Sequence, residues 1–208
     1  MTTDDLDYLM RITIERYKNM LERFTPCKPG SGEFLEQNLI TNFAIAFVKK
    51  FPEANVYTEV PFMHHSEFWN CRVDLYIENG DCGYIIEAKG SQKGGTLFEL
   101  IEKDIERLQS DGLKNSFIAM TKEGKNLPKN MYGIIIADYW GTKQEKENNT
   151  EIDNQFIQKW NKNQFDDRHT NIEGLMKLPA YKVDVSTKYP YWFLAGIIDL
   201  KWEEIINE

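Results

Sequence analysis

Two carboxylates and one amine lie close together between residues 72 and 89, in a pattern that suits metal-assisted hydrolysis. The chain reads RVDLYI over 72–77 and YIIEAK over 84–89, with a turn-prone stretch between them. This composition predicts two strands joined by a tight hairpin. Residues two apart on a strand share a face, so Glu87 and Lys89 point the same way. With Asp74 on the first strand, they are candidates for a magnesium-dependent hydrolytic site.

The register of this hairpin decides how close Asp74 comes to Glu87. If Gly80 and Asp81 form a two-residue loop, Asp74 lies directly opposite Glu87. If Asn79 and Gly80 form the loop, Asp74 is shifted by two positions along the partner strand. Both registers keep Asp74, Glu87 and Lys89 on one face of the sheet. The other face is then expected to hold the apolar residues Val73, Leu75, Ile77, Tyr84, Ile86 and Ala88.

Asp74 followed by Glu87-Ala88-Lys89 resembles the active-site motif of the PD-(D/E)xK nuclease superfamily, whose members have the restriction-endonuclease-like fold. The resemblance covers residues 30–140, and Val73 stands where the motif's name has proline. It implies that Asp74, Glu87 and the carbonyl oxygen of Ala88 hold Mg²⁺, with Mn²⁺ as a substitute. It also implies that Lys89 orients the attacking water and offsets the charge that develops on the phosphate.

A further carboxylate is implied by the stretch GEFLE at 32–36, which resembles the opening of the first core helix in Mrr-like members. The resemblance assigns this carboxylate to Glu36, with Glu33 as the alternative one helical turn earlier. An ordinary solvated glutamate is the other interpretation of Glu36.

The bare motif is not specific, because the chain matches it twice. Asp111 followed by Glu123-Gly124-Lys125 fits the same formula, and with 33 Asp and Glu among 208 residues such matches are expected by chance. The second match falls on a predicted helix-ending turn and a predicted loop. Strand context therefore separates the first match from the second.

Basic residues near the motif are candidates for contact with a nucleic-acid backbone. Lys103 and Arg107 lie four apart on a predicted helix, and Lys122 and Lys125 lie in a predicted loop. Residues four apart on a helix are neighbours on its surface, so one phosphate backbone could contact both. The alternative is that these side chains belong to ordinary solvated surfaces.

Hydrophobic spacing and the resemblance together predict an α/β fold. We expect a restriction-endonuclease-like core with a central mixed five-stranded sheet, flanked by helices in αβββαβ order, with an N-terminal helix and a C-terminal extension. The expected helices span 4–24, 31–50 and 96–109. The expected strands span 56–62, 72–77, 83–89, 116–121 and 132–137.

Residues 1–208 are predicted to form a single nuclease-like domain. Its core is expected at 30–140, followed by a polar insertion or lid at 141–170. An element at 171–208, which includes the aromatic run 189–194, is expected to close the core rather than to stack on bases.

Composition limits the class of protein. A net charge of −8 argues against a non-specific nucleic-acid coat, because neutralising phosphates requires clustered Lys and Arg. Three cysteines without ligand-like spacing favour a cytoplasmic protein over a zinc or disulfide protein. No apolar run approaches the length that would cross a membrane.

The sequence therefore predicts a metal-dependent endonuclease that hydrolyses DNA phosphodiester bonds, in restriction, repair or defence against foreign DNA. RNA is an alternative substrate that these residues do not exclude, and a homodimer or a partner subunit is expected. The competing hypothesis is a catalytically silent nuclease-like module that binds nucleic acid or a protein partner.

Overall fold

The computed structural model of the chain describes residues 1–23, 36–62, 71–90, 94–121, 127–140, 155–161, 174–183 and 191–202. Its helices are α1 (Thr3–Arg23), α2 (Glu36–Lys50), α3 (Gly94–Leu108), α4 (Asp111–Met120) and α6 (Gln155–Asn161). Its strands are β1 (Asn55–Phe62), β2 (Cys71–Asn79), β3 (Cys82–Lys89), β4 (Asn130–Trp140), β5 (Leu175–Lys177), β6 (Tyr181–Val183) and β7 (Tyr191–Asp199).

The strands form one mixed sheet in the order β1-β2-β3-β4-β7-β5, with β6 also paired to β7. Strands β3 and β4 run parallel, and the other neighbouring strands run antiparallel. The expected α/β class and mixed sheet are confirmed. The expected count of five strands was wrong: the expected strand at 116–121 is helical, and the C-terminal segment adds β5, β6 and β7, so the sheet has seven strands within the described residues.

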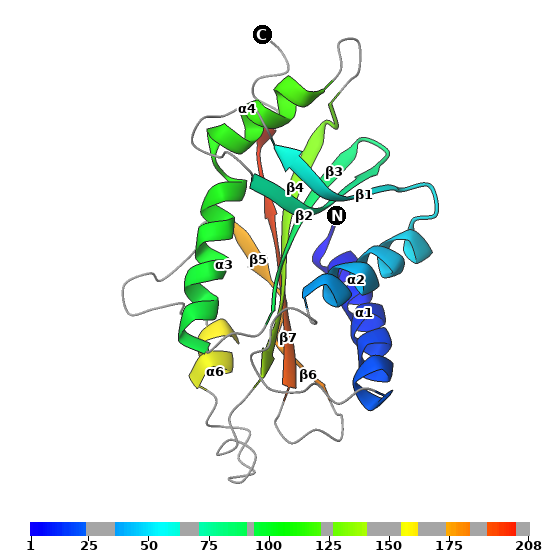
Figure 1. The fold of residues 1–208 in the computed structure, drawn as a ribbon, viewed down its shortest axis with the longest axis vertical. Coiled ribbons are helices and arrows are strands. Elements are labelled where there is room, and N and C mark those ends of the chain that lie inside the picture. The colour runs from blue at the N-terminus through cyan, green and yellow to red at the C-terminus, as the bar shows by residue number, and fades with distance from the viewer. Residues whose placement is uncertain are drawn as a thin grey trace.

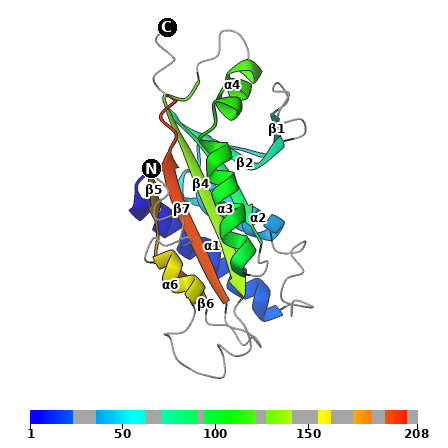
Figure 2. The ribbon, with the colours of Figure 1, turned by 90° about the vertical axis from the view of Figure 1, so that its left-hand side faces the viewer.

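Helices cover both faces of this sheet (Figure 1). Buried residues of α1 and α2 pack on one face, and buried residues of α3, α4 and α6 pack on the other. Figure 2 shows α3 in front of the sheet, with α1 and α2 behind it. The sheet is therefore buried on both sides, which explains the nearly continuous apolar sequences of β3, β4 and β7.

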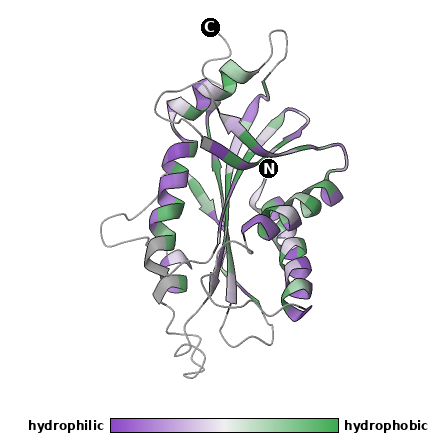
Figure 3. Cartoon of the chain, in the orientation of Figure 1, coloured by the Kyte–Doolittle hydropathy of each residue, from purple (hydrophilic) through white to green (hydrophobic). Residues whose placement is uncertain are grey.

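Helix α3 has one apolar side and one polar side. Leu97, Ile101, Ile105 and Leu108 are buried at helical spacing, whereas Lys103 and Glu106 are exposed. In Figure 3 the hydrophilic side of this helix points away from the sheet. Burial of the apolar side fixes the rotation of α3, and this rotation decides which of its polar residues reach β3.

The strand expected at 116–121 is instead part of helix α4. Ser110 caps this helix, since its side chain accepts a hydrogen bond of 3.2 Å from the backbone N–H of Leu113. Leu113 and Phe117, four residues apart, are both buried. A cap and a helical apolar stripe thus outweigh the strand preference of a short apolar run.

The β2–β3 hairpin has the register with Gly80 and Asp81 in the loop, since Asn79 pairs with Cys82. Gly80 has a φ of 58°, a left-handed conformation that favours glycine. In this register Leu75 pairs with Ile86 as the last pair of the two strands, and Asp74 lies one residue beyond it.

The strict alternation expected along β2 fails at Asp74. Val73 packs with Tyr76 and Ile85 on the α3 side of the sheet, whereas Leu75 packs on the α1 and α2 side. On the neighbouring strand, Glu59 has a φ of 53°, which is unusual for a residue other than glycine. The backbone irregularity beside Asp74 therefore changes the face of the sheet to which Val73 belongs.

Among the helices of the described residues, none has the length and apolar character needed to cross a membrane.

Candidate active site

Asp74 and Glu87 meet across the β2–β3 pair at its open end. The Asp74 carboxylate does not project freely, because its Oδ2 accepts a 2.8 Å hydrogen bond from the backbone N–H of Ala88. The Glu87 side chain is only 2% exposed. Both carboxylates therefore come from neighbouring strands of one hairpin and not from flexible loops.

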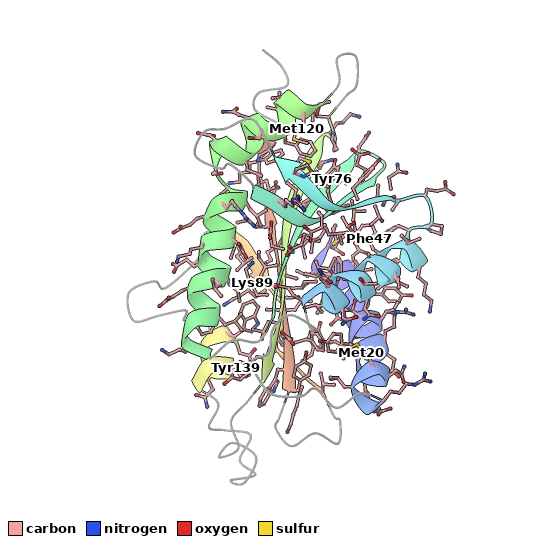
Figure 4. The ribbon with its side chains drawn as sticks, in the orientation of Figure 1. Met20, Phe47, Tyr76, Lys89, Met120 and Tyr139 are labelled. Atoms are coloured by element: carbon pink, nitrogen blue, oxygen red, sulfur yellow. The ribbon has the colours of Figure 1, made fainter. Side chains whose placement is uncertain are left out.

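Lys89 ends strand β3 and reaches towards helix α3. Its Nζ lies 2.7 Å from Oδ2 of Asp104, in a pair that is largely shielded from solvent. Figure 4 places Lys89 in the layer between α3 and the sheet. This ion pair ties the end of β3 to helix α3.

Arg107 joins this pair to Glu87. Its Nη2 lies 2.6 Å from Oε1 of Glu87 and 3.3 Å from Oδ1 of Asp104. Residues 104 and 107 are one helical turn apart, so α3 presents an acid and a base together to β3. The result is a connected chain of ion pairs in the order Lys89, Asp104, Arg107, Glu87.

Glu36, the first described residue of α2, approaches the same site from the other side of the sheet. Its carboxylate accepts a hydrogen bond from the backbone N–H of Gly90, directly after Lys89. Burial raises the pKa of Glu36; the charge of Lys89 opposes this shift and that of Asp74 adds to it. The structure therefore brings Glu36 together with the motif residues.

Burial and mutual repulsion shape the titration of the cluster. Burial raises the pKa of Glu87 to about 8, an effect that Arg107 opposes and that Asp74 reinforces. Burial also raises the pKa of Asp104, although Lys89 and Arg107 oppose the shift. For Lys89, burial lowers the pKa, but the ion pair with Asp104 outweighs it, so the pKa lies above its usual value.

A cavity of about 370 Å³ lies beside Asp74, between α2 and strands β1 and β2. Glu36, Asp74 and Glu59 line it together with the hydroxyl-bearing Thr41 and Thr58. Glu59 is also the residue with the left-handed φ. The cavity gives solvent, or part of a substrate, a route to the Asp74 side of the cluster.

The two basic residues of α3 that were chosen from the sequence have different surroundings. Lys103 is exposed on α3, whereas Arg107 turns inward to Glu87 and Asp104. Lys122 and Lys125 lie outside the described residues, as does Glu33. Contact of Lys103, Lys122 and Lys125 with nucleic acid stays a prediction.

Asp104 is the site residue that the motif search did not select. It is one of several acidic residues on α3. The sequence alone does not distinguish it from its neighbours Glu99, Glu102 and Glu106. A helical projection would have separated it, because Asp104 lies three residues after Ile101 and next to Ile105 on the buried side. An acid on the apolar face of a helix is the signal that could have identified it.

The donor chemistry of the cluster fits a hard divalent cation. Within the described residues, no three Asp, Glu, His or Cys side chains are arranged to hold a metal ion by themselves. Mg²⁺ does not need such a set, because it is commonly held by one or two carboxylates together with water and substrate phosphate oxygens. Asp74 and Glu87 on adjacent strands provide those two carboxylates.

Comparison of the chain with protein-family models, with curated proteins and with solved structures gave no match.

Proposed function

We propose that the chain is a magnesium-dependent nuclease with a restriction-endonuclease-like core, of the PD-(D/E)xK type. The element order α2, β1, β2, β3, α3, α4 and β4, in which α4 is an additional helix and β4 is parallel to β3, supports this core. The hairpin that carries Asp74 and Glu87-Ala88-Lys89 lies at its centre. DNA is the proposed substrate.

The charge balance of the cluster is the observation that carries the proposal. Among the residues that the structure describes, four carboxylates share the site with two cations, Lys89 and Arg107; the carboxylates are those of Glu36, Asp74, Glu87 and Asp104. An excess of negative charge away from water is costly. The raised pKa of Glu36, Glu87 and Asp104 reflects burial and this repulsion. A divalent cation would offset the excess negative charge that arises when all four carboxylates are ionised.

Asp74 and Glu87 would hold the ion, together with the backbone carbonyl oxygen of Ala88 that the family resemblance implies. When bound, the ion supplies Lewis-acid polarisation of a phosphate oxygen. Residues of the chain itself would position the attacking water and offset the charge on the phosphate. An ammonium has three N–H donors, and the pair with Asp104 uses one of them. Lys89 therefore keeps donors for the attacking water and for the charge that grows on the phosphate.

Hydrolysis of plasmid DNA, single-stranded DNA and RNA in Mg²⁺, Mn²⁺ or EDTA tests the proposal and identifies the substrate class. We expect cleavage of DNA in either metal and none in EDTA. The Lys89→Met protein, assayed after its folding has been checked by circular dichroism, should cleave at least about 10²-fold more slowly, because it lacks the positioned donor. Equal cleavage with and without EDTA would refute the metal-dependent mechanism.

The second candidate function is a silent module that binds nucleic acid or a protein. The ion pairs Lys89–Asp104 and Arg107–Glu87 favour it. They give Glu87 and Lys89 a structural role, which is to hold α3 against β3, and this role requires no catalysis. Calorimetric titration with Mg²⁺ separates the two functions. A silent module shows no binding that depends on Asp74 and Glu87, whereas the nuclease loses its binding in the Asp74→Asn and Glu87→Gln proteins.

A further inference from the structure

Lys89 needs more than its place on β3 to act on a substrate. A lysine side chain has four rotatable bonds and loses about 2 kcal/mol of rotamer entropy when its amine is fixed at one point. Strand β3 ends at Lys89, so the sheet fixes its backbone but not its ammonium group. Some other group must set where the amine lies.

Asp104 meets that requirement by geometry. Its Oδ2 lies 2.7 Å from Nζ of Lys89, and only 10% of the Asp104 side chain is exposed. Asp104 is itself held in place, because Arg107 lies 3.3 Å from its other carboxylate oxygen. Arg107 in turn contacts Glu87 at 2.6 Å. The carboxylate that fixes the amine is thus tied to the carboxylate that would hold the metal.

We infer that Asp104 is a positioning residue for Lys89, an inference that rests on the proposed nuclease function. Asp104 holds the Lys89 ammonium by one of its three N–H donors and aims the other two at the reacting water and phosphate. Arg107, which contacts both Asp104 and Glu87, fixes the position of the Asp104 carboxylate relative to that of Glu87. Helix α3 therefore contributes to catalysis through the orientation of Lys89, without contact between Asp104 and the substrate.

The alternative role for Asp104 is purely structural, as one half of a buried ion pair. The two roles differ in what a conservative change affects. A structural role affects stability, and any loss of folded protein lowers the apparent rate for all substrates in proportion. A positioning role lowers kcat in the folded protein but leaves KM unchanged, because substrate binding does not depend on the Lys89 amine.

Steady-state cleavage by the Asp104→Asn protein tests the inference, with Glu106→Gln as a matched control. Both changes remove one negative charge from α3, but Glu106 is exposed to solvent. For Asp104→Asn we expect a fall in kcat of roughly 10- to 100-fold, as for a catalytic group displaced by about 1 Å. KM should equal that of the wild type, and Glu106→Gln should match the wild type throughout.

The Asp104→Glu protein serves where Asp104→Asn does not fold, because it keeps the ion pair and moves the carboxylate by one methylene group. It should bind Mg²⁺ and DNA normally and lose kcat. Wild-type kcat in the folded variant, or a loss confined to KM or metal affinity, would overturn the role of Asp104 while leaving the nuclease function intact. An inactive wild-type protein would instead refute the nuclease function, and the inference with it.

Discussion

At the scale of single residues, the chemistry depends on how the excess negative charge around Glu87 is neutralised. The folded-state pKa of Glu87 is about 8, above the 4.5 of an exposed glutamate. The stability contributed by the protonated carboxyl is therefore fully present below pH 4.5 and is lost as the pH rises through 8. A bound cation would replace the proton, because a metal ligand must be deprotonated.

This linkage predicts the pH dependence of metal binding. Between pH 6 and 8 the affinity for Mg²⁺ should rise by up to about tenfold per pH unit, because Glu87 must first lose its proton. Calorimetry in buffers of different ionisation enthalpy should detect the released proton. The Glu87→Gln protein should bind more weakly and lack this rise. The same pH slope in both proteins would show that Glu87 is not the titrating ligand.

Part of the site could be predicted from residues alone. Asp74, Glu87 and Lys89 were selected by strand context, and the structure brings Glu36 to them through the hydrogen bond from Gly90. Asp104 and the inward turn of Arg107 could not be predicted from the motif. They depend on how α3 is rotated against the sheet, which is a property of packing and not of local sequence.

At the scale of elements, helices α3 and α4 are joined by Ser110. Its hydroxyl donates to the carbonyl oxygen of Arg107 at 2.7 Å and accepts from the N–H of Leu113. One side chain thus closes the last turn of the helix that carries the ion pairs and caps the next helix.

Replacing Ser110 with alanine should lower the free energy of unfolding by about 1 kcal/mol, because the cap is lost. Denaturation in urea measures the change. Asn115→Ala is the control, because Asn115 is an exposed residue of the same helix and alanine has the higher helix propensity, so its stability should be equal or higher. Equal stability of the Ser110→Ala and wild-type proteins would contradict the assignment of Ser110 as the cap.

Element types were predictable where hydrophobic periodicity was long, as in α1, α2 and α3. The run at 116–121 was too short to distinguish a buried strand from the end of a helix. What decided it was the cap at Ser110 and the packing of Phe117 against Tyr76 and Trp202, with ring centroids 5.0 and 5.5 Å apart. Both partners of Phe117 are distant in sequence, so the residues of the run itself cannot predict these contacts.

At the scale of the whole molecule, strand β7 completes the core. It pairs with β4 over nine residue pairs and lies between β4 and β5. Tyr191 of β7 stacks on Tyr17 of α1 and donates a hydrogen bond of 2.5 Å to the buried Asp138 of β4. An apolar run near residue 190 predicts burial, but no local pattern indicates which strand it will join.

The net charge of −8 also acts at this scale. A polyanion approaches such a molecule against long-range repulsion, which salt screens over about 10 Å. A divalent ion at Asp74 and Glu87 would create local attraction where the excess carboxylates lie. The proposed activity therefore depends on those carboxylates more than on a basic surface.

The rate of Mg²⁺-dependent DNA cleavage by the Asp74→Asn protein, relative to Asp81→Asn and wild type, tests the central claim most directly. Both changes remove one carboxylate from the same hairpin, and Asp81 is exposed in the turn. We expect Asp81→Asn to cleave like the wild type, whereas folded Asp74→Asn should cleave at least about 10²-fold more slowly. Cleavage by Asp74→Asn at the wild-type rate would show that Asp74 does not hold the catalytic metal ion.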